Sequence, residues 1–153
     1  MLAKLNASFT RAMDHQDFGK LLLRLTFGIL ILFHGVAKME NGVGWIAQML
    51  QADGLPGFIA YGAYIGEVIA PVLIILGIFP RPAALVMAFN ILVAVFLVVA
   101  GKFFTTTEVG AWGLEGEAMY FFGGLVIMFL GSGRYSVICL LYTSPSPRDM
   151  RRA

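Results

Sequence analysis

Six polar side chains interrupt or border long apolar stretches of this sequence: Arg24, His34, Lys38, Glu67, Asn90 and Glu117. If those stretches cross a membrane, a charged group near the bilayer centre costs about 2.5–3.5 kcal/mol on insertion scales. Each such group therefore needs a partner, a water-filled cavity or a route to the interface. Because buried carboxyl and imidazole groups also carry protons and hold ligands, we treat all six as candidates for handling protons or a small ligand.

Glu67 and Asn90 are the most deeply placed of the six. Glu67 is the only charged residue between positions 56 and 79, and Asn90 lies near the middle of the uncharged stretch 82–100, level with Glu67. A glutamate in this position can carry a proton or donate a hydrogen bond to a ligand, or it can simply tie helices together when protonated or paired. For Asn90, an interhelical hydrogen bond is the simpler role.

The remaining candidates border the apolar stretches. His34 and Lys38 are four residues apart and share a helix face, where His34 can shuttle protons or hydrogen-bond at the interface. Lys38 and Arg24 can both extend along the helix to reach lipid headgroups. Glu117 opens an apolar stretch, and the helix dipole is a sufficient structural reason for an acidic residue there. If these faces turn inward, they line a polar funnel that is open on the outer side.

Composition supports a membrane setting for these residues. Apolar residues make up 59% of the chain and charged residues 13%, about half the share expected of a soluble domain. This composition argues against a disordered chain, a nucleic-acid binder and a water-soluble globule. One cysteine and two histidines exclude an intrachain disulfide and leave too few ligands for a metal centre. We therefore expect no metal and no covalently bound cofactor.

The predicted fold is an all-α integral membrane four-helix bundle. A hydrocarbon core about 30 Å thick needs roughly 20 apolar helical residues. Four stretches satisfy this requirement, at about 21–37, 56–79, 82–100 and 112–131. Strands are excluded because an open sheet would leave unpaired backbone groups in lipid.

Positive charges in the short connections predict the orientation of the bundle. Most of them precede the first span, lie between the second and third, or follow the fourth: Lys4, Arg11, Lys20, Arg81 and Arg134. The other side carries only Lys38 and Lys102. Both termini are therefore predicted to be cytoplasmic.

Three segments make up the predicted domain organisation. Residues 1–20 form a cytoplasmic interfacial segment, residues 21–136 the membrane domain, and residues 137–153 a tail that is disordered or foreign to the protein. Helical spacing of apolar residues predicts two interfacial helices. One lies in the first segment and contains Leu2, Leu5, Phe9 and Met13. The other lies in the first outer loop and contains Trp45, Ile46, Met49 and Leu50.

Several short motifs resemble the DoxX family in order and spacing across about residues 18–137. They are Leu22-Leu23-Arg24-Leu25, Gly28, Phe33-His34-Gly35 and Lys38; Glu67, Leu73, Gly77 and Arg81; Gly116-Glu117; and Gly131-x-Gly133-Arg134-Tyr135-Ser136. The resemblance implies a four-helix protein of the bacterial inner membrane. It also implies an association with membrane redox and sulfur metabolism, since some relatives are small subunits of thiosulfate–quinone oxidoreductases. Arg24, His34, Lys38, Glu67 and Glu117 match the family's polar positions.

Two functions from different classes are consistent with these features. The first is a multi-pass inner-membrane subunit of a redox complex, in which Glu67 and His34 pass protons to a quinone and Lys38 attracts an anionic donor. Such a subunit is not an autonomous enzyme, because it has no evident electron-carrying group, so a soluble partner protein must supply the cofactor. The alternative is a non-enzymatic protein that transports protons or a small molecule, for which we expect a homo-oligomer, or that serves as a scaffold. The residues leave open whether the protein catalyses a reaction.

Overall fold

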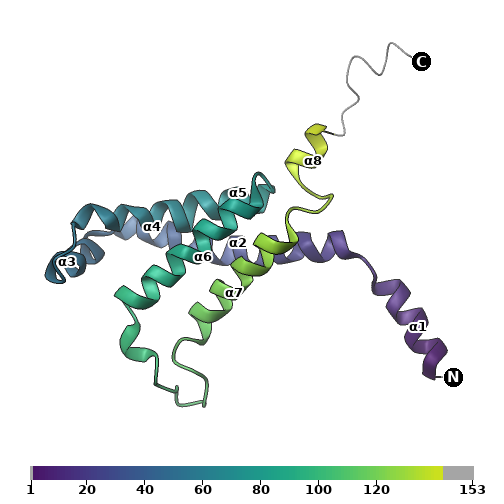
Figure 1. Ribbon diagram of the computed structural model, residues 1–153, viewed down its shortest axis with the longest axis horizontal. Helices are drawn as coiled ribbons and strands as arrows, with labels where there is room; N and C mark the ends of the chain where they lie inside the picture. Colours follow the sequence, from purple (N-terminus) through teal and green to yellow (C-terminus); the bar gives the residue numbers. More distant parts are fainter. Residues whose placement is uncertain (1, 143–153) are drawn as a thin grey trace, which may run out of the picture.

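The computed structural model describes residues 2–142, and these fold into helices joined by short connections (Figure 1). The helices are α1 (Leu2–Met13), α2 (Gln16–Asn41), α3 (Gly44–Ala52), α4 (Gly62–Tyr64), α5 (Ala70–Leu76), α6 (Pro80–Leu97), α7 (Glu115–Leu130) and α8 (Val137–Tyr142). Two short turns flank α4, the 3₁₀ turn η1 (Gly57–Tyr61) and the π-helical turn η2 (Ile65–Ile69). A third turn, the 3₁₀ turn η3 (Ala100–Lys102), follows α6.

The chain is an all-α membrane bundle, as the sequence predicts. Three helical stretches within the described residues are long and apolar enough to cross a membrane: Gln16–Asn41, Gly57–Leu76 and Pro80–Leu97. The fourth expected span is shorter than predicted, because α7 begins at Glu115 rather than Trp112. Its 16 residues rise about 24 Å, and it packs along α6 and α2 (Figure 1).

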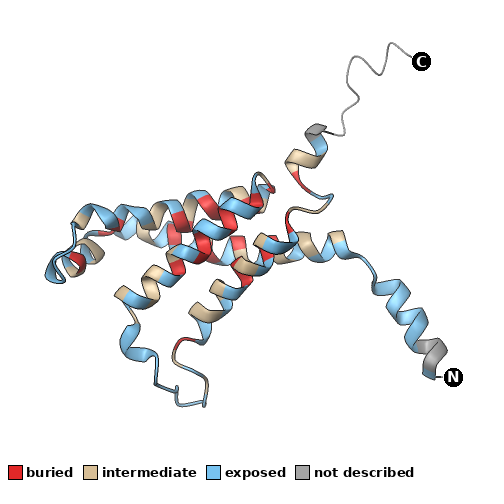
Figure 2. Cartoon of the chain, in the orientation of Figure 1, coloured by how far each residue is buried: buried red, intermediate tan, exposed pale blue. Residues whose placement is uncertain are grey.

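The core lies where α2, α5, α6 and α7 cross, and Figure 2 shows the buried residues gathered at this level. Ile31, Ile74, Met87 and Ile127 are at most 1% exposed and form its centre. Large apolar side chains such as Phe89 point outward from the bundle, as expected of surfaces that face lipid. The core is therefore a thin apolar layer between the two ends of the bundle.

The connection between α5 and α6 is as tight as the two prolines near Arg81 suggested. Gly77 ends α5 with a φ of +71°, a conformation that favours glycine, and α6 begins at Pro80 rather than Pro82. The second expected span therefore ends earlier, at Leu76 instead of Phe79. The resulting hairpin fixes α5 and α6 as antiparallel neighbours.

Both ends of the described chain are helical. α1 projects away from the bundle with Phe9 and Met13 exposed (Figure 1), so the predicted helix forms, while its place at the membrane interface stays a prediction. The segment 137–153, expected to be disordered or foreign, begins with the helix α8. The hydroxyl oxygen of Ser136 accepts a hydrogen bond from the backbone N–H of Cys139, which caps that helix. Residues 143–153 lie outside the described residues.

Candidate functional site

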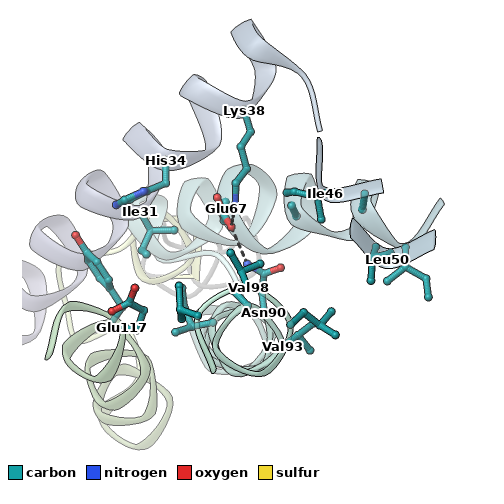
Figure 3. A pocket seen from close by; sticks show the side chains of 18 of the residues that line it. Ile31, His34, Lys38, Ile46, Leu50, Glu67, Asn90, Val93, Val98 and Glu117 are labelled. Carbon is teal, nitrogen blue, oxygen red and sulfur yellow. Dashed lines mark hydrogen bonds and ion pairs between the residues drawn. The ribbon is translucent and has the colours of Figure 1, made fainter. Parts of the chain in front are cut away.

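A cavity of about 500 Å³ opens at the end of the bundle where α2 meets α3 (Figure 3). Five of the six candidate side chains line it: His34, Lys38, Glu67, Asn90 and Glu117. Most of the remaining wall is apolar and comes from α2, α3, η1 and α6, including Ile31, Ile46, Leu50, Ile59, Ile91 and Leu97. Four segments that are distant in the sequence thus bring the predicted polar residues to one place.

Glu67 is the centre of this site, and it faces the interior of the bundle with 4% of its surface exposed. One carboxyl oxygen, Oε1, forms an ion pair with the Lys38 ammonium and accepts a hydrogen bond from Asn90 Nδ2 at 3.0 Å. Figure 3 shows Glu67 lying between these two partners. The other oxygen, Oε2, is buried and has no hydrogen-bond partner among the described residues. Burial of an unpartnered acceptor is unfavourable, so Oε2 is the atom of this site that most needs a hydrogen-bond donor.

The backbone around Glu67 is a single π-helical turn, Ile65–Ile69. Pro71 explains its position, because proline has no N–H for the carbonyl of Glu67 and its ring would collide with that carbonyl in an α-helix. The wider turn avoids this collision and rotates the residues that precede it. Turns of this kind are frequent at functional sites. Our sequence analysis missed the π turn, although a proline inside the apolar stretch 56–79 was its signal.

Two glycines allow the helices to approach closely enough for these contacts. A Cβ on Gly35 would collide with the backbone carbonyl of Glu67, and a Cβ on Gly66 would collide with the Asn90 side chain. Gly35 is therefore required to bring α2 against η2, which places Lys38 one turn further along beside the carboxylate. The Tyr64 hydroxyl supports this arrangement by donating to the Lys38 carbonyl oxygen at 3.2 Å.

His34 and Glu117 line the same cavity from two different helices, α2 and α7. The His34 ring is exposed and packs edge-on against Tyr120, with ring centroids 5.7 Å apart. Glu117 is partly buried in the first turn of α7, where the helix dipole favours an acidic residue. Two groups that can exchange protons thus share the cavity with Glu67. Tyr120, which also lines the cavity, was not among our candidates.

The helix α3 closes one side of the cavity. Leu50 is 2% exposed and packs with Val43 and Ala60, while Trp45 and Ile46 line the cavity. We expected this amphipathic helix to lie at the membrane interface, as Trp45 and its spacing suggested. Its apolar face packs against η1 and the end of α6, while its place at the membrane interface stays a prediction. The same pattern of apolar residues fits both situations, because either one removes the apolar face from water.

Arg24 lies apart from the cavity, and its environment corrects our expectation that it would extend to the headgroups. The side chain is 1% exposed. Its guanidinium donates to the carbonyl oxygens of Ile74 and Tyr135, so it joins the end of α5 to the segment before α8. Gly77 leaves room for it, because a Cβ there would collide with Arg24 Nη1.

No group of three or more metal-ligating side chains occurs within residues 2–142. The polar groups that line the cavity include the two carboxyl groups of Glu67 and Glu117, an ammonium, an amide, an imidazole and the hydroxyl of Tyr120.

Comparison with known proteins identifies the family. Residues 19–100, which include α2, α3 and the Glu67 turn, match the DoxX family. The chain belongs to the DoxX family. The family resemblance found in the sequence is therefore confirmed, and this DoxX protein is a membrane protein.

One curated relative of this DoxX protein is named "Putative oxidoreductase CatD" and comes from Bacillus subtilis (strain 168). It is 34% identical over 82 residues, which cover 54% of this chain. The match spans 60% of the length of CatD, so it leaves a large part of that protein without a counterpart here. No solved structure matches this chain.

Proposed function

We propose that this DoxX protein is an inner-membrane subunit of a redox complex and binds the headgroup of a quinone in the cavity beside Glu67. The observation that carries the proposal is the Glu67 carboxyl group, which has one oxygen bound by Lys38 and Asn90 and the other unpartnered. The cavity volume of about 500 Å³ and its apolar walls are typical of small-molecule sites. The printed name of CatD supports a redox association.

Reduction of a quinone to a hydroquinone consumes two electrons and two protons. The electrons come from a soluble partner protein with its own redox cofactor, because the described residues contain no metal-ligating cluster and the chain has one cysteine. The role of this chain is to bind and orient the headgroup and to deliver protons. His34 and Glu117 exchange protons within the cavity, and Glu67 holds the headgroup at the ion pair.

The ion pair changes the role that we expected for Lys38. Its ammonium is already neutralised by Glu67, so the pair carries no net charge. An anionic electron donor would gain little attraction there and would lose its hydration in an apolar cavity. A neutral ligand therefore fits the cavity, and the electron donor belongs to the partner protein.

The alternative function, transport of protons or a small molecule, requires a path through the bundle. Ile74, Met87 and Ile127 are fully buried in the apolar layer. A transport path would have to open this layer, whereas a binding site needs only the cavity that is already present on one side of the layer.

The test is the amount of quinone that copurifies with the full chain in native-lipid nanodiscs. Ala94 lines the cavity, so Ala94→Phe fills it while every polar residue of the site is kept. Val86→Phe adds a similar bulk on the exposed face of the same helix. We expect nearly stoichiometric quinone by mass spectrometry in the native protein and in Val86→Phe, and a bulk-lipid level in Ala94→Phe. A bulk-lipid level in the native protein would contradict the proposal.

A further inference from the structure

Resting on the quinone-binding function proposed above, we infer that the cavity binds the reduced form, the hydroquinone, more tightly than the quinone. The selecting group is Oε2 of Glu67, which accepts a hydrogen bond from a hydroquinone hydroxyl. This inference concerns the redox form of the ligand, and it depends on which carboxyl oxygen of Glu67 already has hydrogen-bond partners.

The two carboxyl oxygens of Glu67 are not equivalent. Oε1 faces two donors, the ammonium of Lys38 and the amide nitrogen of Asn90. Oε2 has no donor within residues 2–142 and is covered by protein, so a ligand in the cavity that Glu67 lines reaches this atom only when the side chains beside it move. An ionised carboxylate is an acceptor only, so a ligand that contacts Oε2 must bring the hydrogen.

The two redox forms of the ligand differ at this point. A quinone headgroup presents two carbonyl oxygens. Both are acceptors, so neither can form a hydrogen bond with Oε2. A hydroquinone presents two hydroxyl groups, either of which donates to a carboxylate in a strong, charge-assisted hydrogen bond. The reduced form therefore satisfies the orphaned acceptor and the oxidised form leaves it unpaired.

Charge balance restricts the ligand further to a neutral hydroquinone. The Lys38–Glu67 pair is neutral as a unit, and within residues 2–142 no third charged side chain forms a hydrogen bond or ion pair with it. A deprotonated hydroquinone would place a second anion beside the Glu67 carboxylate. The neutral form avoids this repulsion and keeps the proton that makes the hydrogen bond.

Preferential binding of the reduced form has a direct redox consequence. For a two-electron couple, each tenfold preference raises the reduction potential of the bound ligand by about 30 mV. A bound quinone is then a better electron acceptor than a free one. The cavity would thus favour electron flow from the partner protein into the quinone.

The geometry also predicts a variant with the opposite preference. In Glu67→Gln, the amide oxygen stays beside the donors of Lys38 and Asn90, because the amide nitrogen would repel both. The –NH₂ group then occupies the place of Oε2. The group that contacts the ligand changes from an acceptor into a donor, which pairs with a quinone carbonyl.

The experiment titrates three probes into the full chain in nanodiscs under anaerobic conditions, with empty nanodiscs as the partition blank. The probes are a decyl-substituted benzoquinone, its hydroquinone and the dimethyl ether of that hydroquinone, which cannot donate. We expect the native protein to bind the hydroquinone at least tenfold more tightly than the other two. Glu67→Gln should reverse the order of quinone and hydroquinone. Glu115→Gln, the same exchange at an exposed position, should keep the native order.

Equal binding of the three probes by the native protein, or tighter binding of the quinone, would overturn the inference and leave quinone binding standing. Binding of every probe at the level of empty nanodiscs would contradict the proposed function and the inference together. The native protein alone decides between these outcomes, so the test does not depend on the folding of Glu67→Gln.

Discussion

The two buried charges of this protein, Glu67 and Arg24, are held in different ways. Both are almost fully enclosed, at 4% and 1% exposure, and each keeps one polar atom that has no hydrogen-bond partner in the described part of the chain. Glu67 is held by the side chains of Lys38 and Asn90 and lines a cavity. Arg24 is held by backbone carbonyls and packs against Gly77. Burial alone therefore does not distinguish a binding group from a structural one.

What distinguishes them is the type of partner and the space beside the charge. Carbonyl oxygens near a helix end need a donor, and Arg24 supplies one where α5 ends, so its position is explained by the fold itself. The side chains of the Lys38–Glu67 pair bind each other and Asn90 rather than a helix end, and Glu67 lines a cavity. We therefore propose ligand binding for the Glu67 end of the bundle, whereas Arg24 anchors helices at its own end.

The largest expected effect follows from removing the cation of the buried pair. Lys38→Met leaves the Glu67 carboxylate enclosed without a counter-charge, which we expect to destabilise the fold by about 3 kcal/mol. The double variant Lys38→Met/Glu67→Met should recover most of this loss. Reversible unfolding in mixed micelles measures both. Lys102→Met, at an exposed lysine, is the control. An equal loss of stability in this variant would show that the effect of Lys38→Met does not come from the buried pair.

The next effect tests the structural role of Arg24. Arg24→Met leaves the carbonyls of Ile74 and Tyr135 without their donor, and we expect a loss of about 2 kcal/mol. Hydroquinone affinity of the folded fraction should stay within twofold of the native value. Unfolding titrations and ligand titrations on the same preparation measure the two quantities. A tenfold loss of affinity would place Arg24 in the binding machinery.

A smaller effect tests the contact that aligns Lys38 with Glu67. Gly35→Ala places a Cβ against the Glu67 carbonyl, and we expect a cost of about 1.5 kcal/mol as α2 moves away from η2. The ion pair should loosen, which also weakens hydroquinone binding. Gly19→Ala is the matched control on the same helix, because its Cβ would meet nothing within 4 Å. The control should be neutral or slightly more stable.

The smallest effect concerns the cavity wall. His34→Gln removes the edge-on contact with Tyr120, and we expect a loss of about 0.5 kcal/mol in stability. Hydroquinone affinity should hardly change, because His34 does not contact Glu67 Oε2. Calorimetric ligand titration checks this expectation. A large loss of affinity would show that the ligand contacts His34, and the binding contact would then have to be assigned to His34 rather than to Glu67.

Much of this arrangement could be predicted from the residues. The apolar stretches located α2, α6, α7 and the segment from η1 to α5, and five of the six polar candidates found in these stretches or at their borders line one cavity. The extent of α7 was overestimated, because Trp112 and Gly113 are apolar enough to extend the stretch but belong to the preceding loop. The membrane orientation, a homo-oligomer and a soluble partner stay predictions.

The sequence by itself determined that the chain is an all-α membrane protein of the DoxX type and that Glu67 would need a partner inside the bundle. This is possible because the cost of placing a residue in lipid depends mainly on that residue. The tertiary structure alone decided that Lys38 pairs with Glu67, that Arg24 binds carbonyls and that α3 closes the cavity. These contacts depend on helix rotation and close approach, which Gly35, Gly66 and the turn before Pro71 set together in three dimensions.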